Sequence, residues 1–158
     1  MKVEKLSAIA ELVSSIAIVV TLAYLAIQTQ QNTLAIQATV RQSMLEEDRE
    51  LLFKQIDYPF LAPTTYDQSE LTPDQQSQRQ SWITAFFRAR ESHWLQYQAG
   101  VIDETTWSSY RFPLGIVLAS DLSRSQWQAS VDRGEFAQGF IDDVHTFLSD
   151  SLDQPATE

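Results

Sequence analysis

The chain has 158 residues, a formal net charge of −10 and no cysteine. Lys2, Lys5, Glu4 and Glu11 cancel within residues 1–27, so the acidic excess belongs to the remainder of the chain. An acidic surface repels nucleic acid and anionic lipid headgroups, which excludes both as direct ligands. The lack of cysteine excludes disulfides, thiolate metal sites and a cysteine nucleophile. Ala, Leu, Gln, Glu and Arg dominate and long alternating Val/Ile/Thr runs are missing, which favours helix.

An apolar segment occupies the N-terminus. From Leu6 to Ile27 the only charged residue is Glu11, and at ~1.5 Å per residue a helix of this length covers roughly 33 Å, about one hydrocarbon core. A cleavable signal peptide is a rival, but no Ala-x-Ala cleavage site lies at the right place. A buried helix of a soluble domain is the other rival. We therefore expect residues 1–28 to be a retained single-span anchor.

The span has two different faces at ~100° per residue. One face is wholly apolar and would contact lipid; it holds Ile9, Leu12, Val13, Ile16, Val19, Val20, Ala23 and Ile27. The opposite face gathers small and hydroxyl residues at alternating spacings of three and four, and we predict a helix–helix interface there made of Ser7, Ala10, Glu11, Ser14, Ala17 and Thr21. Small residues let two helices approach closely, and this spacing is typical of a left-handed helix pair.

Glu11 allows two interpretations. It lies near the headgroups, hydrated or paired with Lys5 or a lipid amine, or it faces a partner helix or polar cavity. A carboxylate in hydrocarbon costs several kcal/mol unless it is neutralised or paired, so the second interpretation requires a partner. An ion or proton path through Glu11 is a special case of this second interpretation. Basic residues favour the cytoplasmic side of a span, so Lys2 and Lys5 predict that the N-terminus is cytoplasmic and the domain lies outside. This orientation depends on a bias of only two charges.

The next segment predicts a long helix that leaves the span without a break. Residues 28–57 contain no Gly or Pro, and Pro59 and Pro63 follow. A stripe recurs at spacings of three and four: Leu34, Ala38, Arg41, Leu45, Asp48, Leu52 and Ile56. Because the stripe includes Arg41 and Asp48, we expect it to pack on the later helices of the same chain more than to form a coiled coil.

The later helices have clear start and stop signals. After a loop at 58–72, Thr72, Pro73 and Gln75 predict a capping box for a helix over about 74–99 that ends at Gly100. Asp103 starts another helix, and Pro113 is expected to break or kink it. Further helical segments are expected at the buried run 115–120, at about 123–131 and at about 135–152, with a frayed tail over 153–158. The fold class is thus all-α, with a small helical-bundle domain over 29–152.

Few residues suggest chemistry. Arg88, Arg90 and Glu91 are candidates for buried ion pairs that fix the junction between helices. His93 lies among aromatic residues and is expected to be packed or hydrogen-bonded. Asp142 and His145 share a helix face, but a second acid-x-x-His pair is missing, so we predict no metal site. No catalytic residue, cofactor site or metal ligand is assigned.

The chain resembles an uncharacterised family of small, membrane-anchored helical bacterial proteins. The family has a span of the form EIIGAIAVVxSLIYLAxQ, then QNT, then RExxxxQYxxGxxDxxxW. The matching positions, which extend over most of the chain to about residue 135, are 11–28, Gln31-Asn32-Thr33, Arg90-Glu91, Gln96-Tyr97, Gly100, Asp103 and Trp107. The resemblance implies a membrane-anchored helical protein and no activity. Relatives often carry Arg in "QIRQNT", whereas residues 29–33 here are uncharged.

Three functional hypotheses follow. The leading one is a non-enzymatic, single-pass protein of the bacterial inner membrane that acts through protein contacts, as a homo-oligomer or an accessory or assembly subunit of a membrane complex. Its partners are then membrane lipid and its own or other membrane-protein helices. The alternative is an oligomeric channel or transport component with Glu11 on a polar path. The second alternative is a ligand sensor or enzyme that uses the region of Arg90, Glu91, His93 and Tyr97.

Overall fold

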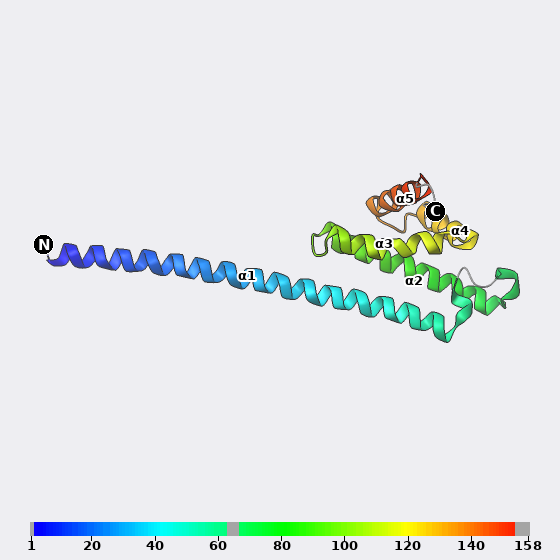
Figure 1. The fold of residues 1–158 in the computed structure, drawn as a ribbon, viewed down its shortest axis with the longest axis horizontal. Coiled ribbons are helices and arrows are strands. Elements are labelled where there is room, and N and C mark those ends of the chain that lie inside the picture. Colours follow the sequence, from blue (N-terminus) through cyan, green and yellow to red (C-terminus); the bar gives the residue numbers. More distant parts are fainter. Residues whose placement is uncertain (1, 63–66, 154–158) are drawn as a thin grey trace, which may run out of the picture. The chain divides into compact units, whose positions relative to one another are not determined.

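The computed structural model describes the backbone of residues 2–62 and 67–153, and the side chains of 11–62, 67 and 69–150. Throughout these residues the regular structure is helical, which confirms the predicted all-α class (Figure 1). The chain divides into two compact units, Met1–Val40 and Arg41–Glu158. Helix α1 (Lys2–Asp57) contributes to both, so the predicted continuation of the apolar helix into a long helix is confirmed.

The first unit consists of the N-terminal part of α1. An 18-residue window has a mean hydropathy of 2.0 and none of it is buried by the rest of the chain. Large apolar side chains such as Leu12, Val19 and Leu22 are 60–64% exposed. In length and composition this helix could cross a membrane.

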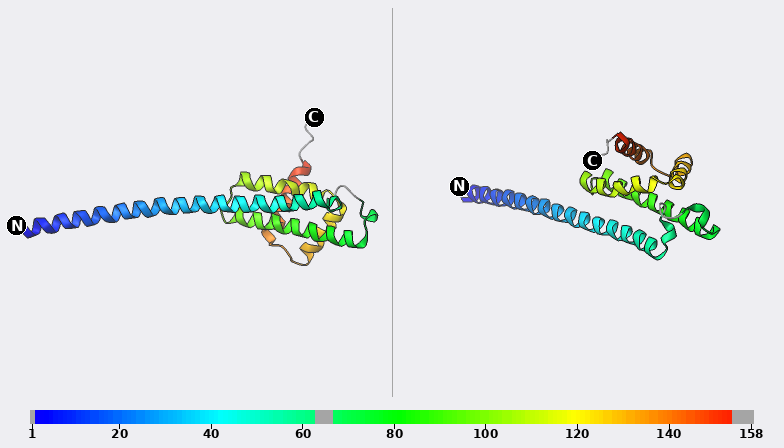
Figure 2. Two further views of the ribbon diagram at one scale, coloured as in Figure 1. Left: turned by 90° about the horizontal axis from the view of Figure 1, so that it is seen from below. Right: turned by 45° about the vertical axis from the view of Figure 1, so that its right-hand side comes forward.

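The second unit is a small helical bundle. The end of α1, α2 and α3 run side by side with their directions reversing at each connection, and α4 and α5 pack on them (Figures 1 and 2). Its elements after α1 are η1 (Pro59–Leu61), η2 (Gln68–Glu70), α2 (Pro73–Gln98), α3 (Glu104–Leu118), α4 (Asp121–Asp132) and α5 (Gln138–Asp153).

The predicted helix boundaries around α2 are confirmed. The Thr72 side chain accepts a hydrogen bond from the Gln75 backbone, and the Gln75 side chain accepts one from the Thr72 backbone. Pro73 occupies the first helical position, where its missing N–H costs nothing. Gly100, at φ +70°, ends the helix in a left-handed conformation that other residues rarely adopt. The Asp103 side chain then caps α3 through the Thr106 backbone N–H, at 2.8 Å.

The expected interruption at Pro113 does not end the helix, because α3 is continuous from Glu104 to Leu118. Proline removes the hydrogen bond to the Ser109 carbonyl, but Trp107 and Leu114, on either side of that turn, are both 0% exposed. Tertiary packing therefore holds α3 together across the proline. The expected burial of residues 115–120 is found at Val117 and Leu118, which are 7% and 3% exposed, but not at Ile116, which is 53% exposed.

The core of the domain is aromatic. Four aromatic rings form a cluster in which the centroids of contacting rings are 5.0–6.4 Å apart: Phe87, Trp127, Phe136 and Phe140. These ring contacts join α2, α4 and α5. Trp107 of α3 adds a fifth ring, 6.5 Å from Phe140. Large aromatic side chains bury the most apolar area per residue, which suits a domain of this size.

The face of α1 that packs on the domain differs from the predicted one. Met44 is 3% exposed, whereas Leu45, Leu52 and Ile56 of the predicted stripe are 58%, 58% and 70% exposed. Helix α1 is therefore turned so that Met44 and its neighbours along the helix face inward. Asp48, the one member of the predicted stripe that is half-buried, faces α2.

Candidate functional site

A polar network that joins three helices of the domain is centred on Arg90 in α2. This side chain is 2% exposed and forms a two-pronged ion pair with Asp48 of α1, whose side chain is 26% exposed. Arg90 was a candidate for a buried ion pair, and its partner Asp48 lies 42 residues earlier in the chain. The planar guanidinium suits such an arrangement because it can bind both carboxylate oxygens at once.

Aromatic rings and a backbone carbonyl complete the surroundings of Arg90. Its guanidinium carbon lies 4.9 Å from the centre of the Phe86 ring and 5.7 Å from that of Tyr110. Its Nη1 also donates to the Tyr110 carbonyl of α3, at 3.3 Å. That carbonyl belongs to the turn weakened by Pro113. Arg90 therefore links α1, α2 and α3 and supports α3 where its own hydrogen bonding is interrupted.

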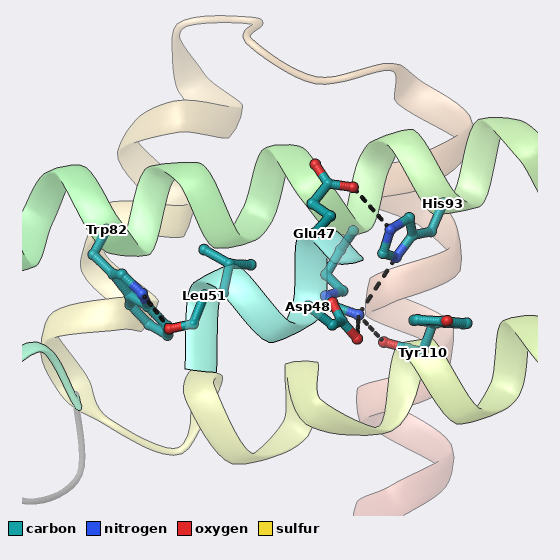
Figure 3. A network of polar contacts seen from close by, with 7 residues as sticks. Glu47, Asp48, Leu51, Trp82, His93 and Tyr110 are labelled. Carbon is teal, nitrogen blue, oxygen red and sulfur yellow. Dashed lines mark hydrogen bonds and ion pairs between the residues drawn. The ribbon is translucent and has the colours of Figure 1, made fainter. Parts of the chain in front are cut away.

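His93 extends the network toward the surface (Figure 3). Its Nδ1 lies 3.4 Å from Nη1 of Arg90, which can only donate, so Nδ1 is the acceptor. The proton of a neutral ring then resides on Nε2, which donates to Oε2 of Glu47 at 3.1 Å. Burial, together with the neighbouring charge of Arg90, lowers the pKa of His93 to about 3. Burial also raises the pKa of Glu47, against the opposing effect of Arg90.

This arrangement leaves His93 little capacity for chemistry. The side chain is 1% exposed and both ring nitrogens have partners within the domain. A general base needs an accessible nitrogen within hydrogen-bond reach of a substrate. The geometry of His93 is that of a structural histidine, which holds Glu47 and Arg90 in position.

The other candidates of this region lie apart from the network. Arg88 pairs with Glu91 at 3.0 Å, and its side chain is 48% exposed. Arg88 also donates to the Glu135 carbonyl, and Glu91 accepts from the Ala137 backbone N–H at 2.7 Å. This pair therefore attaches α2 to the segment before α5. The Tyr97 ring stacks on Trp107, with centroids 6.3 Å apart.

A largely apolar cavity of about 360 Å³ lies between α1, α2 and α3. The Asp48–Arg90 pair forms part of its wall. Its other lining residues are Leu51, Leu52, Gln55, Ala62, Trp82, Phe86, Pro113, Ile116 and Val117. Trp82 is fixed by a hydrogen bond from its indole nitrogen to the Leu51 carbonyl of α1, at 3.3 Å (Figure 3).

The predicted membrane interface lies partly in the described region. The side chains of Glu11, Ser14, Ala17 and Thr21 are exposed, and the Thr21 hydroxyl donates to the Ala17 carbonyl at 2.8 Å. The Thr21 oxygen keeps lone pairs for a donor from another helix. The side chains of Ser7 and Ala10 lie outside the described residues. Asp142 and His145 are both exposed, and no cluster of three metal-ligating side chains occurs in the described part of the chain.

Comparisons with family models, with curated proteins and with solved structures found no match.

Proposed function

We propose that this chain is a membrane-anchored helical protein that acts through protein–protein contacts, as a homo-oligomer or as an accessory or assembly subunit of a membrane complex. The proposed location is the bacterial inner membrane, with a single pass and the domain on the extracytoplasmic side. The anchor would contact lipid on one face and another helix on the other, and the domain would carry no catalytic centre.

The observation that carries the proposal is the division of the anchor into two faces. Val13, Val19 and Val20 are 60–64% exposed on one face, which suits acyl chains. Ser14, Ala17 and Thr21 are exposed on the other, where a lipid-facing helix has no need of small or hydroxyl residues. In a membrane, close packing of small residues and interhelical hydrogen bonds drive helix association. The network around Arg90 and His93, in which both ring nitrogens of His93 and both terminal nitrogens of Arg90 have partners within the domain, supports a structural domain.

A pair of matched substitutions tests this. Ala17→Leu adds bulk on the small-residue face, and Ala23→Leu makes the same change on the apolar face. We expect Ala17→Leu to reduce the assembled fraction several-fold and Ala23→Leu to leave it unchanged. The measurement is the mass of the full chain after gentle extraction into lipid nanodiscs, with identification of co-purifying proteins. A strictly monomeric wild-type chain without any co-purifying protein would refute the proposal.

A further inference from the structure

The domain exposes a second apolar surface, which the anchor does not explain. Among the large side chains that α1 and α3 leave more than half exposed, five share one side of the domain, which we call the α1–α3 face. They are Leu45 (58%), Leu52 (58%), Ile56 (70%), Phe112 (63%) and Ile116 (53%). A contiguous exposed apolar patch on a small domain marks an interaction surface more often than a scatter of single residues does.

The five residues belong to one surface. Leu52 of α1 and Ile116 of α3 line the same cavity. Leu45 and Ile56 share the side of α1 on which Leu52 lies, because two helical turns separate Leu45 from Leu52 and one turn separates Leu52 from Ile56. Phe112 is one turn before Ile116 on α3. The surface is therefore a groove with apolar rims on two helices.

The chemistry of the groove indicates an apolar occupant. Among the described residues that line the cavity, the charged ones are Asp48 and Arg90, and they neutralise each other. A charged ligand would have to displace one of them, at a high cost for Arg90 because it is 2% exposed. An amphipathic helix needs no such displacement, and it can lay apolar residues into a groove at helical spacing.

The periodicity of α1 points to the helix that fits. Steps of seven residues from Ala17 lead to Leu45 and Leu52, and steps of seven from Thr21 lead to Ile56. The two series are Ala17, Tyr24, Gln31, Ala38, Leu45, Leu52 and Ser14, Thr21, Gln28, Ala35, Gln42, Arg49, Ile56. Their members are mostly small, amide or apolar residues, and steps of seven keep the same side of two supercoiled helices in contact. Arg49, the one charged member, has its guanidinium 5.6 Å from the Phe53 ring centre.

We propose that a second copy of this chain covers the α1–α3 face, with the two α1 helices parallel and in the same register. A parallel arrangement follows when both copies are anchored in one membrane. In a two-fold symmetric dimer each residue of the two series lies opposite the same residue of the other copy, so the apolar residues of α1 contact one another. Phe112 and Ile116 flank the contact. This inference rests on the proposed function and names the partner and the surface of the domain.

The absence of cysteine from the chain permits a direct test in native membranes. Single Leu45→Cys and Leu52→Cys variants place one thiol at the proposed contact, and Leu95→Cys, on α2, is the control because Leu95 is 49% exposed outside the face. Mild oxidation should yield a disulfide-linked dimer from the two α1 variants at several times the rate of the control. Disulfides form only when the two β-carbons come within about 4.5 Å, so the readout is specific.

An Ala17→Cys variant separates the two proposals, since it reports only on the anchor. Dimers from Ala17→Cys, with Leu45→Cys and Leu52→Cys no faster than Leu95→Cys, would overturn the α1–α3 contact and leave the proposed function standing. Cross-linking of Leu52→Cys to a different protein in place of itself would likewise overturn the second-copy assignment. As a second readout, Leu52→Glu should abolish dimer formation while Leu95→Glu does not. Both variants should still unfold cooperatively, because both side chains are exposed and neither fills the core of the domain.

Discussion

Removal of the Arg90 side chain should destabilise the domain strongly. Arg90→Ala deletes the ion pair with Asp48, the hydrogen bond to the Tyr110 carbonyl and the contact with the Phe86 ring. Breaking a buried ion pair by removing one partner costs about 3–5 kcal/mol. Because the Asp48 side chain is 26% exposed, water can partly solvate the carboxylate that remains. We therefore expect the lower end of that range, about 3 kcal/mol.

The companion variant Asp48→Ala should cost at least as much. It leaves without its partner a guanidinium whose residue is 2% exposed in the wild-type domain. The double variant removes both charges and should cost less than the sum of the two single variants by about 1.5–3 kcal/mol, since neither charge is then left without its partner. Arg124→Ala is the control: its pair with Asp121 is exposed, at 59% and 95%, and should contribute less than 1 kcal/mol.

Urea unfolding of the full chain in mild detergent, followed by tryptophan fluorescence, measures these free energies. The four tryptophans all lie beyond residue 80, so the signal reports on the domain and not on the anchor. A loss below about 1 kcal/mol for Arg90→Ala would refute the reasoning, as would strict additivity of the two single variants. Either result would mean that the network contributes little to holding α1 against α2 and α3.

Two further predictions concern the same unfolding measurement. The low folded-state pKa of His93, about 3 against 6.5 for the free side chain, means that the unfolded state binds more protons below pH 6.5. The stability that this group contributes is therefore full above pH 6.5 and falls by about 2 kcal/mol between pH 7.5 and 5. The raised pKa of Glu47 opposes this trend near the titration of that carboxyl group. His93→Gln should flatten the dependence of the unfolding free energy on pH, and an unchanged slope in this variant would contradict the low pKa of His93. Two glycines should respond oppositely to alanine. At Gly139 the Cβ of an alanine would come within 2.9 Å of the Trp94 ring, and this overpacking should destabilise the domain by about 1–3 kcal/mol. At Gly115 the nearest atom, in the Phe147 ring, is 3.5 Å from the added Cβ, so alanine should stabilise the helix by about 0.5–1 kcal/mol. Equal effects at both sites would contradict the packing around α5.

Local signals in the sequence were sufficient to predict the helices and most of their ends. The Thr72 capping box, Gly100 and the Asp103 cap each act within a few residues of the boundary that they define. Of the break or kink expected at Pro113, the break was wrong for the opposite reason. Proline lowers the stability of an isolated helix, but here residues distant in sequence, including Arg90, contact the turn around it. The start of α5 at Gln138 instead of about residue 135 also reflects a contact from α2, between Glu91 and the Ala137 backbone.

The network around Arg90 shows where sequence reasoning reaches its limit. Arg90 could be singled out because a basic residue among aromatic residues on a helix needs a partner. Asp48 could be noted only as a defect in an apolar stripe, because nothing local connects it with a residue 42 positions away. The stripe itself was assigned to the wrong side. Met44 and Leu51 form a neighbouring apolar row one position earlier than Leu45 and Leu52, and periodicity alone cannot decide which of two adjacent rows faces the core.

The ion pair supplies the information that periodicity lacks. With two apolar rows side by side, α1 could pack on α2 and α3 in more than one rotation at similar hydrophobic gain. Asp48 lies between the two rows, and its pairing with Arg90 is satisfied in one rotation only, because a turn of one residue moves the carboxylate by about 100° around the helix. Because well-packed apolar side chains in place of a buried ion pair often stabilise a protein as well as the pair does, we infer that this pair contributes mainly specificity. In fixing the inward row at Met44, the pair also leaves Leu45, Leu52 and Ile56 on the outside, where a second chain can reach them.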